Sequence, residues 1–329
     1  MLQNTDAPSF AAGEYVGEGG HDQRIDNFFL KRFRNIPKSH IYQLIRSGQV
    51  RVNGKRVDAS YRLQMGDRVR IPPIRGSERR SDRPVPVINS SSFAFTVLYQ
   101  DDAILAIDKP GGMAVHGGSG IAFGVIEQLR AQNPTWKFLE LVHRLDRDTS
   151  GVLLLAKKRS ALVELHRQIR EGSMEKHYLT LVKGVWRNTR QHVRLPLDKF
   201  VTAAGERRVM VASDESASGK SMHAHTIFTL QRAWSNFSLL DAEIKTGRTH
   251  QIRVHLAHLG YPIAGDDKYG DFSLNKQLAK VGTCGVGSKL IRMFLHARSL
   301  RFTHPLTGES VTIKSQLTNE LQKFIDNLN

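Results

Sequence analysis

Two short apolar runs flank a polar segment near the middle of the chain. Residues 138–142 and 151–156 are mostly apolar and of strand length, which predicts two buried strands. The connection at 143–150 has the sequence His-Arg-Leu-Asp-Arg-Asp-Thr-Ser. Because rigid strands hold such a loop while its side chains stay reachable, we regard it as a candidate site for chemistry. Ion pairing among its arginines and aspartates is the alternative interpretation.

Residues 21–75 combine helical and strand patterns. Apolar residues recur at helical spacing over 24–33 and 39–48. The alternating run at 50–57 contains Asn-Gly, which is a strong hairpin signal, and a further strand is predicted at 66–71. The pattern therefore predicts a small α+β domain.

Two segments lack these patterns. Residues 1–20 are polar and rich in glycine, so we expect a flexible tail. Residues 76–92 hold arginines, prolines and serines with little to bury, which indicates a linker. The chain is thus expected to form two domains, at 21–75 and 93–329.

Strand patterns dominate the second domain. Their order lacks the regular βαβ alternation of a doubly wound sheet, so the expected class is α+β with a mixed or antiparallel sheet. A helix is predicted over 249–260, with Thr249 as its N-cap and Gly260 at its end. Strands are predicted at 95–99, 103–107, 176–182, 237–244, 300–303 and 311–313, and the other helices at 123–132, 160–172 and from about 318.

Charge changes this picture by indicating a partner. The chain has 48 Lys and Arg against 31 Asp and Glu, a net charge of +17. Residues 21–75 carry thirteen basic and four acidic residues, so this segment alone has a net charge of +9. Such a density attracts phosphates without reading bases, so RNA or DNA is the leading partner. The candidate phosphate contacts are Arg32, Lys38, Arg46, Arg51, Lys55 and Arg56.

Several classes of protein are disfavoured. Cys284 is the single cysteine, which excludes an intrachain disulfide and a cysteine metal cluster and fits a reducing cytoplasm. The N-terminal residues do not resemble a signal peptide, and no apolar run approaches 18 residues, so no membrane association is expected. His250, His255 and His258 lack the spacing and the acidic partner of a zinc-protease helix, so no metal is predicted.

Five sequence blocks together resemble the RluA-type pseudouridine synthases. They are HRLDRDTSG at 143–151, KHY at 176–178, GRTHQIR at 247–253, DKP at 108–110 and FTHPLTGE at 302–309. The resemblance spans about residues 22–315 and is strongest to the members that modify 23S ribosomal RNA of the large subunit. The order of elements in 21–75 resembles the small S-four-like RNA-binding fold known from a ribosomal protein.

The resemblance implies a cofactor-free isomerisation of uridine to pseudouridine in a flipped-out nucleotide. It assigns the catalytic aspartate to Asp146, its pairing arginine to Arg253 and the tyrosine packed against the base to Tyr178. Arg144 would help to displace the base. Further substrate contacts are expected from His143, Arg248 and Lys109.

Several alternatives remain open at this point. Asp148 could replace Asp146, although its place in the motif is less favourable. The aspartate could act as a nucleophile or as a base. The target could be a tRNA or another RNA, because enzymes of different specificity share this domain. A non-catalytic ribosome assembly factor on the same fold is the remaining alternative, and the family suggests a monomer.

Overall fold

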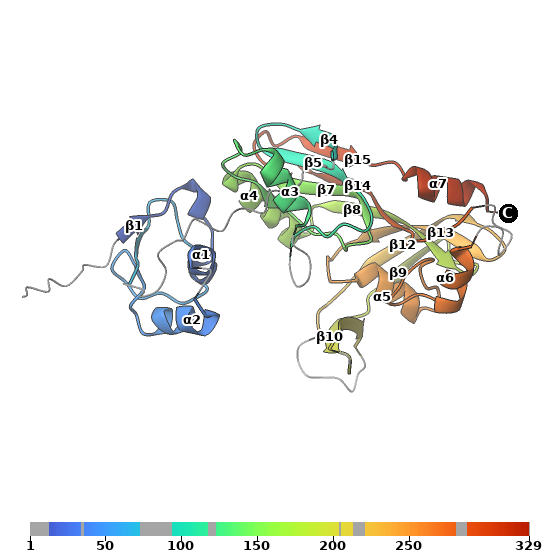
Figure 1. Cartoon of the computed structure of the whole chain (residues 1–329), viewed down its shortest axis with the longest axis horizontal. Coiled ribbons are helices and arrows are strands. Elements are labelled where there is room, and N and C mark those ends of the chain that lie inside the picture. The colour runs from blue at the N-terminus through green and yellow to red at the C-terminus, as the bar shows by residue number, and fades with distance from the viewer. Residues whose placement is uncertain are drawn as a thin grey trace, which may run out of the picture. The chain divides into compact units, whose positions relative to one another are not determined.

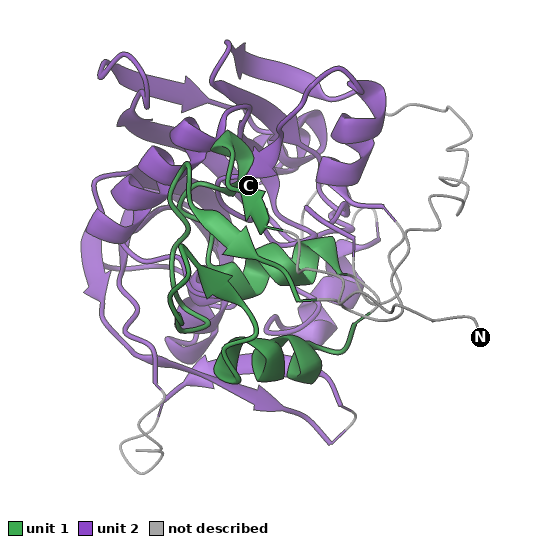
Figure 2. Cartoon of the chain, turned by 90° about the vertical axis from the view of Figure 1, so that its left-hand side faces the viewer, with its two compact units in different colours: residues 1–92 green, residues 93–329 purple. Residues whose placement is uncertain are grey.

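The computed structural model describes residues 13–33, 36–72, 94–117, 123–203, 205–212, 221–280 and 288–328. The chain divides into two compact units, residues 1–92 and 93–329 (Figures 1 and 2). Each has its own hydrophobic core. The expected linker at 76–92 lies outside the described residues.

Unit 1 packs helices on a small antiparallel sheet. Its fully buried side chains include Ile25, Phe29, Ile41, Leu63 and Val69, which come from both helices, the sheet and the loop between them. The strand order is β1, β3, β2. The elements are β1 (Gly13–Tyr15), α1 (Ile25–Arg32), α2 (Lys38–Arg46), β2 (Arg51–Val52) and β3 (Arg68–Arg70), with a short 3₁₀ helix at Glu18–Gly20.

Two expectations for this unit need correction. The flexible tail does not extend to residue 20, because β1 pairs with β3 and Val16 is buried in the core. The Asn-Gly turn is present, but β2 pairs with β3 instead of forming a regular hairpin with residues 55–57. The Asn53 side chain explains this, because it donates to Asp67 (2.8 Å) and accepts from the Arg68 amide (2.8 Å), which ties the turn to β3.

Unit 2 is built on a ten-stranded sheet. Eight strands run in the order β4, β5, β7, β14, β8, β13, β12, β9, with β6 added to β7 and β15 to β14. The pair β7 and β14 is parallel, whereas β5 with β7 and β8 with β14 are antiparallel. The α+β class with a mixed sheet is thus confirmed. The strands are β4 (Thr96–Gln100), β5 (Ile104–Lys109), β6 (Glu140–Leu141), β7 (Ser150–Ala156), β8 (Glu175–Lys183), β9 (Arg190–Val193), β12 (Thr226–Ala233), β13 (Phe237–Ile244), β14 (Leu295–Thr303) and β15 (Ser310–Lys314).

Helices cover the sheet, and both of its faces are buried. Leu153 and Leu155 of β7 join one core cluster, whereas Leu154 joins another on the opposite face, as alternation along a strand requires. Strands β10 (Leu197–Val201) and β11 (Arg207–Val211) form a separate hairpin that projects from the sheet (Figure 1). The helices are α3 (Val125–Gln132), α4 (Arg159–Glu171), α5 (Gln251–His258), α6 (Phe272–Leu278) and α7 (Asn319–Asp326).

The start of α5 differs from expectation. Its N-cap is His250, not Thr249, and His250 has a left-handed backbone with φ 55°. Gln251 explains the shift, because its side chain accepts from the Thr246 hydroxyl (2.7 Å) and the Arg248 amide (3.1 Å), so the preceding loop ends in a tight turn. Strands β9 to β12 and α6 were not predicted from the sequence.

Gly151 fixes the beginning of β7. It has φ 105°, and a Cβ built on it would lie 2.2 Å from the Ala297 carbonyl oxygen. Residues Gly151 and Ala297 are partners in the parallel pairing of β7 with β14. Only glycine allows this close approach, which places the polar 143–149 connection at one end of the central strands.

Candidate active site

Asp146 lies in the connection between β6 and β7, on a short turn. The Thr149 amide donates to the Asp146 carbonyl (3.2 Å) and closes that turn. Lys109, at the end of β5, binds the backbone of this turn. Its ammonium donates to the carbonyls of Pro110 (2.7 Å), Met113 (2.8 Å) and Arg147 (3.0 Å). The backbone beside Asp146 is therefore fixed by a buried side chain.

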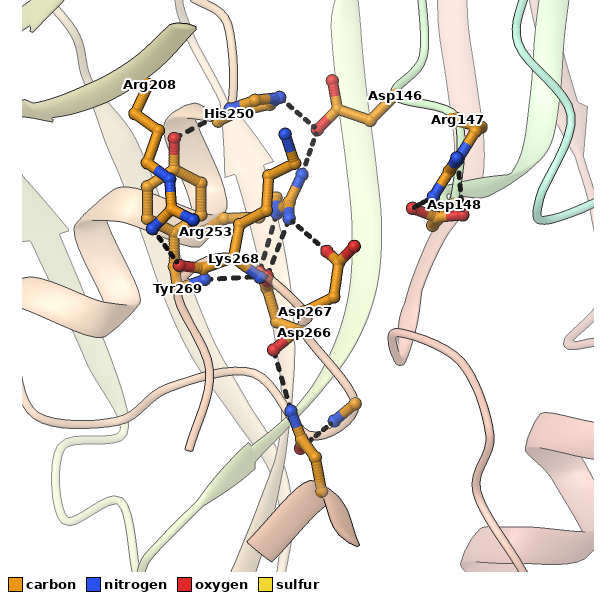
Figure 3. Close-up of polar contacts among 12 residues, drawn as sticks. Asp146, Arg147, Asp148, Arg208, His250, Arg253, Asp266, Asp267, Lys268 and Tyr269 are labelled. Carbon is orange, nitrogen blue, oxygen red and sulfur yellow. Dashed lines mark hydrogen bonds and ion pairs between the residues drawn. The ribbon is translucent and has the colours of Figure 1, made fainter. Parts of the chain in front are cut away.

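Arg253 of α5 contacts the Asp146 carboxylate directly. Its Nη1 lies 3.3 Å from Asp146 Oδ2 (Figure 3). Its Nε and Nη2 bind the two oxygens of Asp266 at 2.7 Å each, and Nη2 also lies 3.3 Å from Asp267. Burial alone would lower the pKa of Arg253, but the carboxylates of Asp266 and Asp146 raise it. The guanidinium is thus a permanent, oriented positive charge.

The two oxygens of Asp146 have different surroundings. Oδ2 faces both Arg253 Nη1 and the His250 Nε2, which lies 3.8 Å away (Figure 3). Among the residues that the structure describes, none forms a hydrogen bond with Oδ1. The carboxylate is therefore held through Oδ2, and Oδ1 is left available to a ligand.

Tyr178 of β8 brings an aromatic ring to the same place. Its side chain is buried, with 8% of its surface exposed. Burial, together with the negative charge of Asp146, raises the pKa of its hydroxyl above the ordinary range. The phenol therefore stays protonated and neutral.

These side chains line one pocket, which is open to solvent. Arg144 and Arg248 are exposed at this pocket. Arg248 is oriented by a hydrogen bond from its Nε to the His223 carbonyl (3.0 Å). The lining of the pocket includes Leu145, Asp146, Tyr178, Ile244, Ile252, Arg253 and Leu295. The wall is thus apolar beside Tyr178 and cationic beside Asp146.

The structure brings five of the seven predicted catalytic and substrate-binding residues to this pocket, but not the other two. Lys109 is fully buried and all three of its bonds go to backbone carbonyls, so it does not face substrate. His143 is outside the pocket lining, and its Nε2 accepts from the Leu154 amide (3.1 Å). Burial, helped by the charge of Lys176, lowers the pKa of His143 to about 4. Both residues support the loop instead of contacting a ligand.

Asp148 follows the alternative interpretation of the motif. Its carboxylate pairs with Arg147, with the Arg147 Nε 3.2 Å from Oδ1, and it is absent from the pocket lining. Ion pairing within the loop is therefore found for Asp148 with Arg147, whereas Asp146 pairs with Arg253 of α5.

Sequence reasoning did not identify the supporting groups Asp266 and Tyr269, or the place of His250 beside Asp146. Asp266 is fully buried and binds Arg253 through both oxygens. The Tyr269 hydroxyl lies 2.9 Å from His250 Nδ1. The polar run Gly-Asp-Asp-Lys-Tyr-Gly at 265–270 was the available signal, because buried acidic residues need a partner.

The predicted phosphate contacts lie on unit 1. Lys38, Arg46, Lys55 and Arg56 are exposed, on α2 and just after the Asn-Gly turn. Arg32 is exposed and pairs with Glu14. Arg51 is half-buried and donates to the Gly48 and Gly54 carbonyls at 3.2 and 3.4 Å.

Comparison with known families matches both units. Residues 103–258 match the RNA pseudouridylate synthase family, and residues 23–69 match the S4 domain. In the part of the chain that the structure describes, no helix is long and apolar enough to cross a membrane.

Curated relatives match over nearly the whole chain. The chain is 49% identical to ribosomal large subunit pseudouridine synthase C of Salmonella typhimurium over 304 residues, which is 92% of each chain. It is 48% identical to the protein of that name from Escherichia coli K12 (93% of each chain), and 46% identical to that of Pasteurella multocida (94% and 91%).

Solved structures share the fold. Human RNA pseudouridylate synthase domain containing 1 has a TM-score of 0.56 at 24% identity, covering 69% of this chain and 85% of the human one. Human RNA pseudouridylate synthase domain containing 4 has a TM-score of 0.55 at 23% identity, covering 71% and 92%. From its identity to the curated relatives and its two matched domains, this chain belongs to the RluA-type pseudouridine synthase family, with an S4 domain ahead of the catalytic domain.

Proposed function

We propose that this protein isomerises specific uridines of large-subunit (23S) ribosomal RNA to pseudouridine, with Asp146 as the catalytic residue. The proposal rests on the Asp146 carboxylate, which lines the pocket. Arg253 binds its Oδ2, whereas Oδ1 has no hydrogen-bond partner among the described residues. The names of the curated relatives support the large ribosomal subunit as the source of the substrate.

The reaction needs a single reactive carboxylate and no redox cofactor. The bond between ribose C1′ and uracil N1 breaks, the uracil turns, and a bond forms between C1′ and C5. C5 then loses its proton to solvent and N1 takes one up. The atoms of substrate and product are the same, so the reaction is an isomerisation. Asp146 Oδ1 is the reacting oxygen, whether it attacks as a nucleophile or removes a proton as a base.

Arg253 orients this carboxylate and places a positive charge beside it. The bidentate contact with Asp266 fixes the plane of the guanidinium, so that Nη1 points to Asp146. A preorganised charge of this kind costs no rearrangement during the reaction. The Arg253 side chain is 3% exposed, which limits the screening of this contact by water.

Tyr178 and Arg144 handle the base. The neutral phenol ring of Tyr178 lies among Ile244, Ile252 and Leu295, a surface on which a flat uracil packs well. The raised pKa of the hydroxyl disfavours a phenolate, so the role of Tyr178 is packing and not that of an anionic base. Arg144, exposed at the pocket, occupies the space that the flipped uridine leaves in its RNA stack.

Unit 1 supplies sequence-independent affinity. We assign the unit that begins with β1 and extends to about residue 75 as the RNA-binding domain, 76–92 as a linker and 93–329 as the catalytic domain. The match to the S4 domain and the net charge of +9 over 21–75 support phosphate binding there. We further propose that the protein acts in the cytoplasm as a monomer.

The test is pseudouridine mapping in cells that lack the protein. Carbodiimide-based mapping of large-subunit RNA should show sites that disappear and return on complementation with wild type. Asp146→Asn should not restore them, because an amide is neither nucleophile nor base. Asp148→Asn is the matched control, since Asp148 pairs with Arg147 outside the pocket, and it should restore them.

Other outcomes would revise the proposal in different ways. Changes in tRNA but not in large-subunit RNA would replace the substrate and keep the reaction. Full restoration by Asp146→Asn would mean that the aspartate is not catalytic. Loss of ribosomal particles without loss of any pseudouridine would favour the assembly-factor alternative.

A further inference from the structure

His250 is a side chain that the proposed mechanism does not use, although it faces the reactive aspartate. It precedes α5, and its imidazole points toward the same oxygen of Asp146 that Arg253 contacts (Figure 3). Its side chain is 15% exposed, so it belongs to the wall of the pocket. Its two nitrogens face different partners, and these partners fix which nitrogen carries the proton.

The Tyr269 hydroxyl determines the proton on Nδ1. The Val209 amide donates to the Tyr269 oxygen (3.0 Å), and His250 Nδ1 lies 2.9 Å from that same oxygen. The hydroxyl proton needs an acceptor, and among the described residues Nδ1 is the one within reach. Nδ1 therefore accepts and carries no proton of its own, because a neutral imidazole has one donor and one acceptor.

The other nitrogen then carries the proton. Nε2 faces Asp146 Oδ2 at 3.8 Å, and a carboxylate accepts hydrogen bonds only. A protonated Nε2 is favoured there, and a lone pair would be repelled. Both ends of the ring thus point to the same tautomer.

Charges around His250 support its neutral form. Burial lowers its pKa, and the positive charges of Arg253 and Lys268 lower it further, against the opposite effects of Asp146 and Asp266. The imidazole is therefore a neutral donor near neutral pH and does not form an ion pair that would quench the carboxylate.

We propose that His250 is a positioning residue for Asp146: its Nε2 proton, directed by the Tyr269 hydroxyl, acts as a second donor to Oδ2 and keeps Oδ1 turned toward the nucleotide. A movement of roughly 1 Å converts the present contact into a hydrogen bond, and such contacts commonly tighten when substrate excludes water. This inference rests on the proposed uridine isomerisation.

The β10–β11 hairpin helps to position His250, because a backbone amide of this hairpin binds Tyr269. Val209 belongs to β11, and its amide holds Tyr269 in place. Arg208 also donates to the Lys268 carbonyl (3.2 Å), and Glu206 pairs with the Lys268 ammonium. The hairpin that projects from the sheet is thus tied to the segment that orients His250.

Replacing His250 by asparagine or by glutamine distinguishes a positioning role from a merely structural one. Asn places its amide near the position of Nδ1 and tolerates the left-handed backbone at φ 55°, but does not reach Asp146. Gln places its amide nitrogen near the position of Nε2. We expect His250→Asn to lower the single-turnover rate about 10- to 100-fold and His250→Gln to lower it less than about 5-fold.

The measurement is tritium release from a large-subunit RNA transcript labelled at C5 of uridine, with the dissociation constant for the same RNA measured in parallel. Both variants should bind RNA within about 3-fold of wild type, because the change affects the rate and not the contacts with phosphate. The inference would be overturned if His250→Asn reacted faster than His250→Gln, or if the variants lost RNA affinity without any loss of rate. Wild type that releases no tritium from any RNA would instead overturn the proposed function.

A double-mutant cycle tests the link to Tyr269. Tyr269→Phe should slow the reaction in the wild-type background, because Nδ1 loses its donor. In the His250→Asn background the same change should have no further effect on the rate, since the Nε2 donor is already absent. Equal effects in both backgrounds would show that Tyr269 acts independently of His250.

Discussion

The ammonium of Lys109 donates a hydrogen bond of 3.0 Å to the carbonyl of Arg147, the residue that follows Asp146. Its two other bonds go to carbonyls of the loop after β5, so its three donors meet three acceptors. Burial lowers the pKa of Lys109 to about 7, and these acceptors match the charged form. One buried side chain therefore joins two loops beside Asp146.

Lys109→Met should reduce both stability and activity. It leaves three carbonyls without their donor, at about 1–3 kcal/mol for each that stays unsatisfied, so we expect the free energy of unfolding to fall by about 3 kcal/mol or more. The freed loop should also lower the rate, because Asp146 loses its fixed backbone. Denaturant unfolding and single-turnover kinetics measure the two effects. Lys157→Met is the control, since Lys157 donates to the Asp101 carbonyl (2.6 Å), beyond the other end of β7, and it should keep the rate.

Arg253→Lys should show that a positive charge alone is insufficient. Lysine cannot bind both oxygens of Asp266 and reach Asp146 at once, so the orientation of the carboxylate is lost. We expect the single-turnover rate to fall about 100-fold or more with little change in RNA affinity. A rate within a few-fold of wild type would show that charge, and not geometry, supports Asp146.

Gly151→Ala should destabilise unit 2 strongly. The new Cβ would lie 2.2 Å from the Ala297 carbonyl oxygen, on a residue with φ 105°. Gly172→Ala is the matched control, because Gly172 also has a positive φ (71°) but no atom within 4 Å of the added carbon. The backbone strain common to both costs about 1–3 kcal/mol, so the excess loss at Gly151 measures the clash. Thermal unfolding of both variants decides the comparison.

The motifs predicted residues that meet at one pocket better than they predicted the side chains that support them. Asp146, Tyr178 and Arg253 lie in ungapped blocks, and the structure places all three at one pocket. Lys109 and His143 also lie inside such blocks, at 108–110 and 143–151, but their side chains turn toward backbone groups. Position along the chain does not tell which way a side chain at a strand end points, because that depends on partners far away in sequence.

The elements show the same limit. Strands with clear alternation, such as β13 at Phe237–Ile244, agree with the predicted bounds. The amphiphilic hairpin of β10 and β11 carries a weaker pattern, since Phe200 and Met210 are exposed. Asp266 was missed for a related reason: its role arises from a bidentate pair with Arg253 that only the folded chain creates.

His143 should make stability depend on pH on the acid side. Its pKa is about 4 in the folded protein against an ordinary 6.5, so the unfolded chain binds the proton more readily between these values. The contribution of His143 is complete above pH 6.5 and is lost as the pH falls toward 4. His143→Gln keeps an acceptor for the Leu154 amide and removes the titration. Denaturant unfolding measured from pH 4 to 7 gives the free energy of unfolding as a function of pH. This free energy should change less with pH for His143→Gln than for wild type, and an equal change in both would contradict the assignment.

Removing four exposed cations from unit 1 should weaken RNA binding without changing the chemistry. Lys38, Arg46, Lys55 and Arg56 are exposed, and each cation removed from a bound phosphate should lower the salt slope of the binding constant by about 0.7–0.9. The quadruple alanine variant should therefore reduce the slope by up to about 3.6. Its rate at saturating RNA should stay within about 3-fold of wild type, because the cations are expected to bind phosphate and not the reacting base.

The matched control for this variant replaces Lys157, Lys183, Lys199 and Lys245 of unit 2, which removes the same charge from the other unit. Long-range attraction by net charge alone predicts equal reductions of the slope for the two variants. Direct phosphate binding on unit 1 predicts a larger reduction for the first, because a bound cation releases the counterions of its phosphate. Titrations of large-subunit RNA at several salt concentrations therefore distinguish a binding surface from a general field.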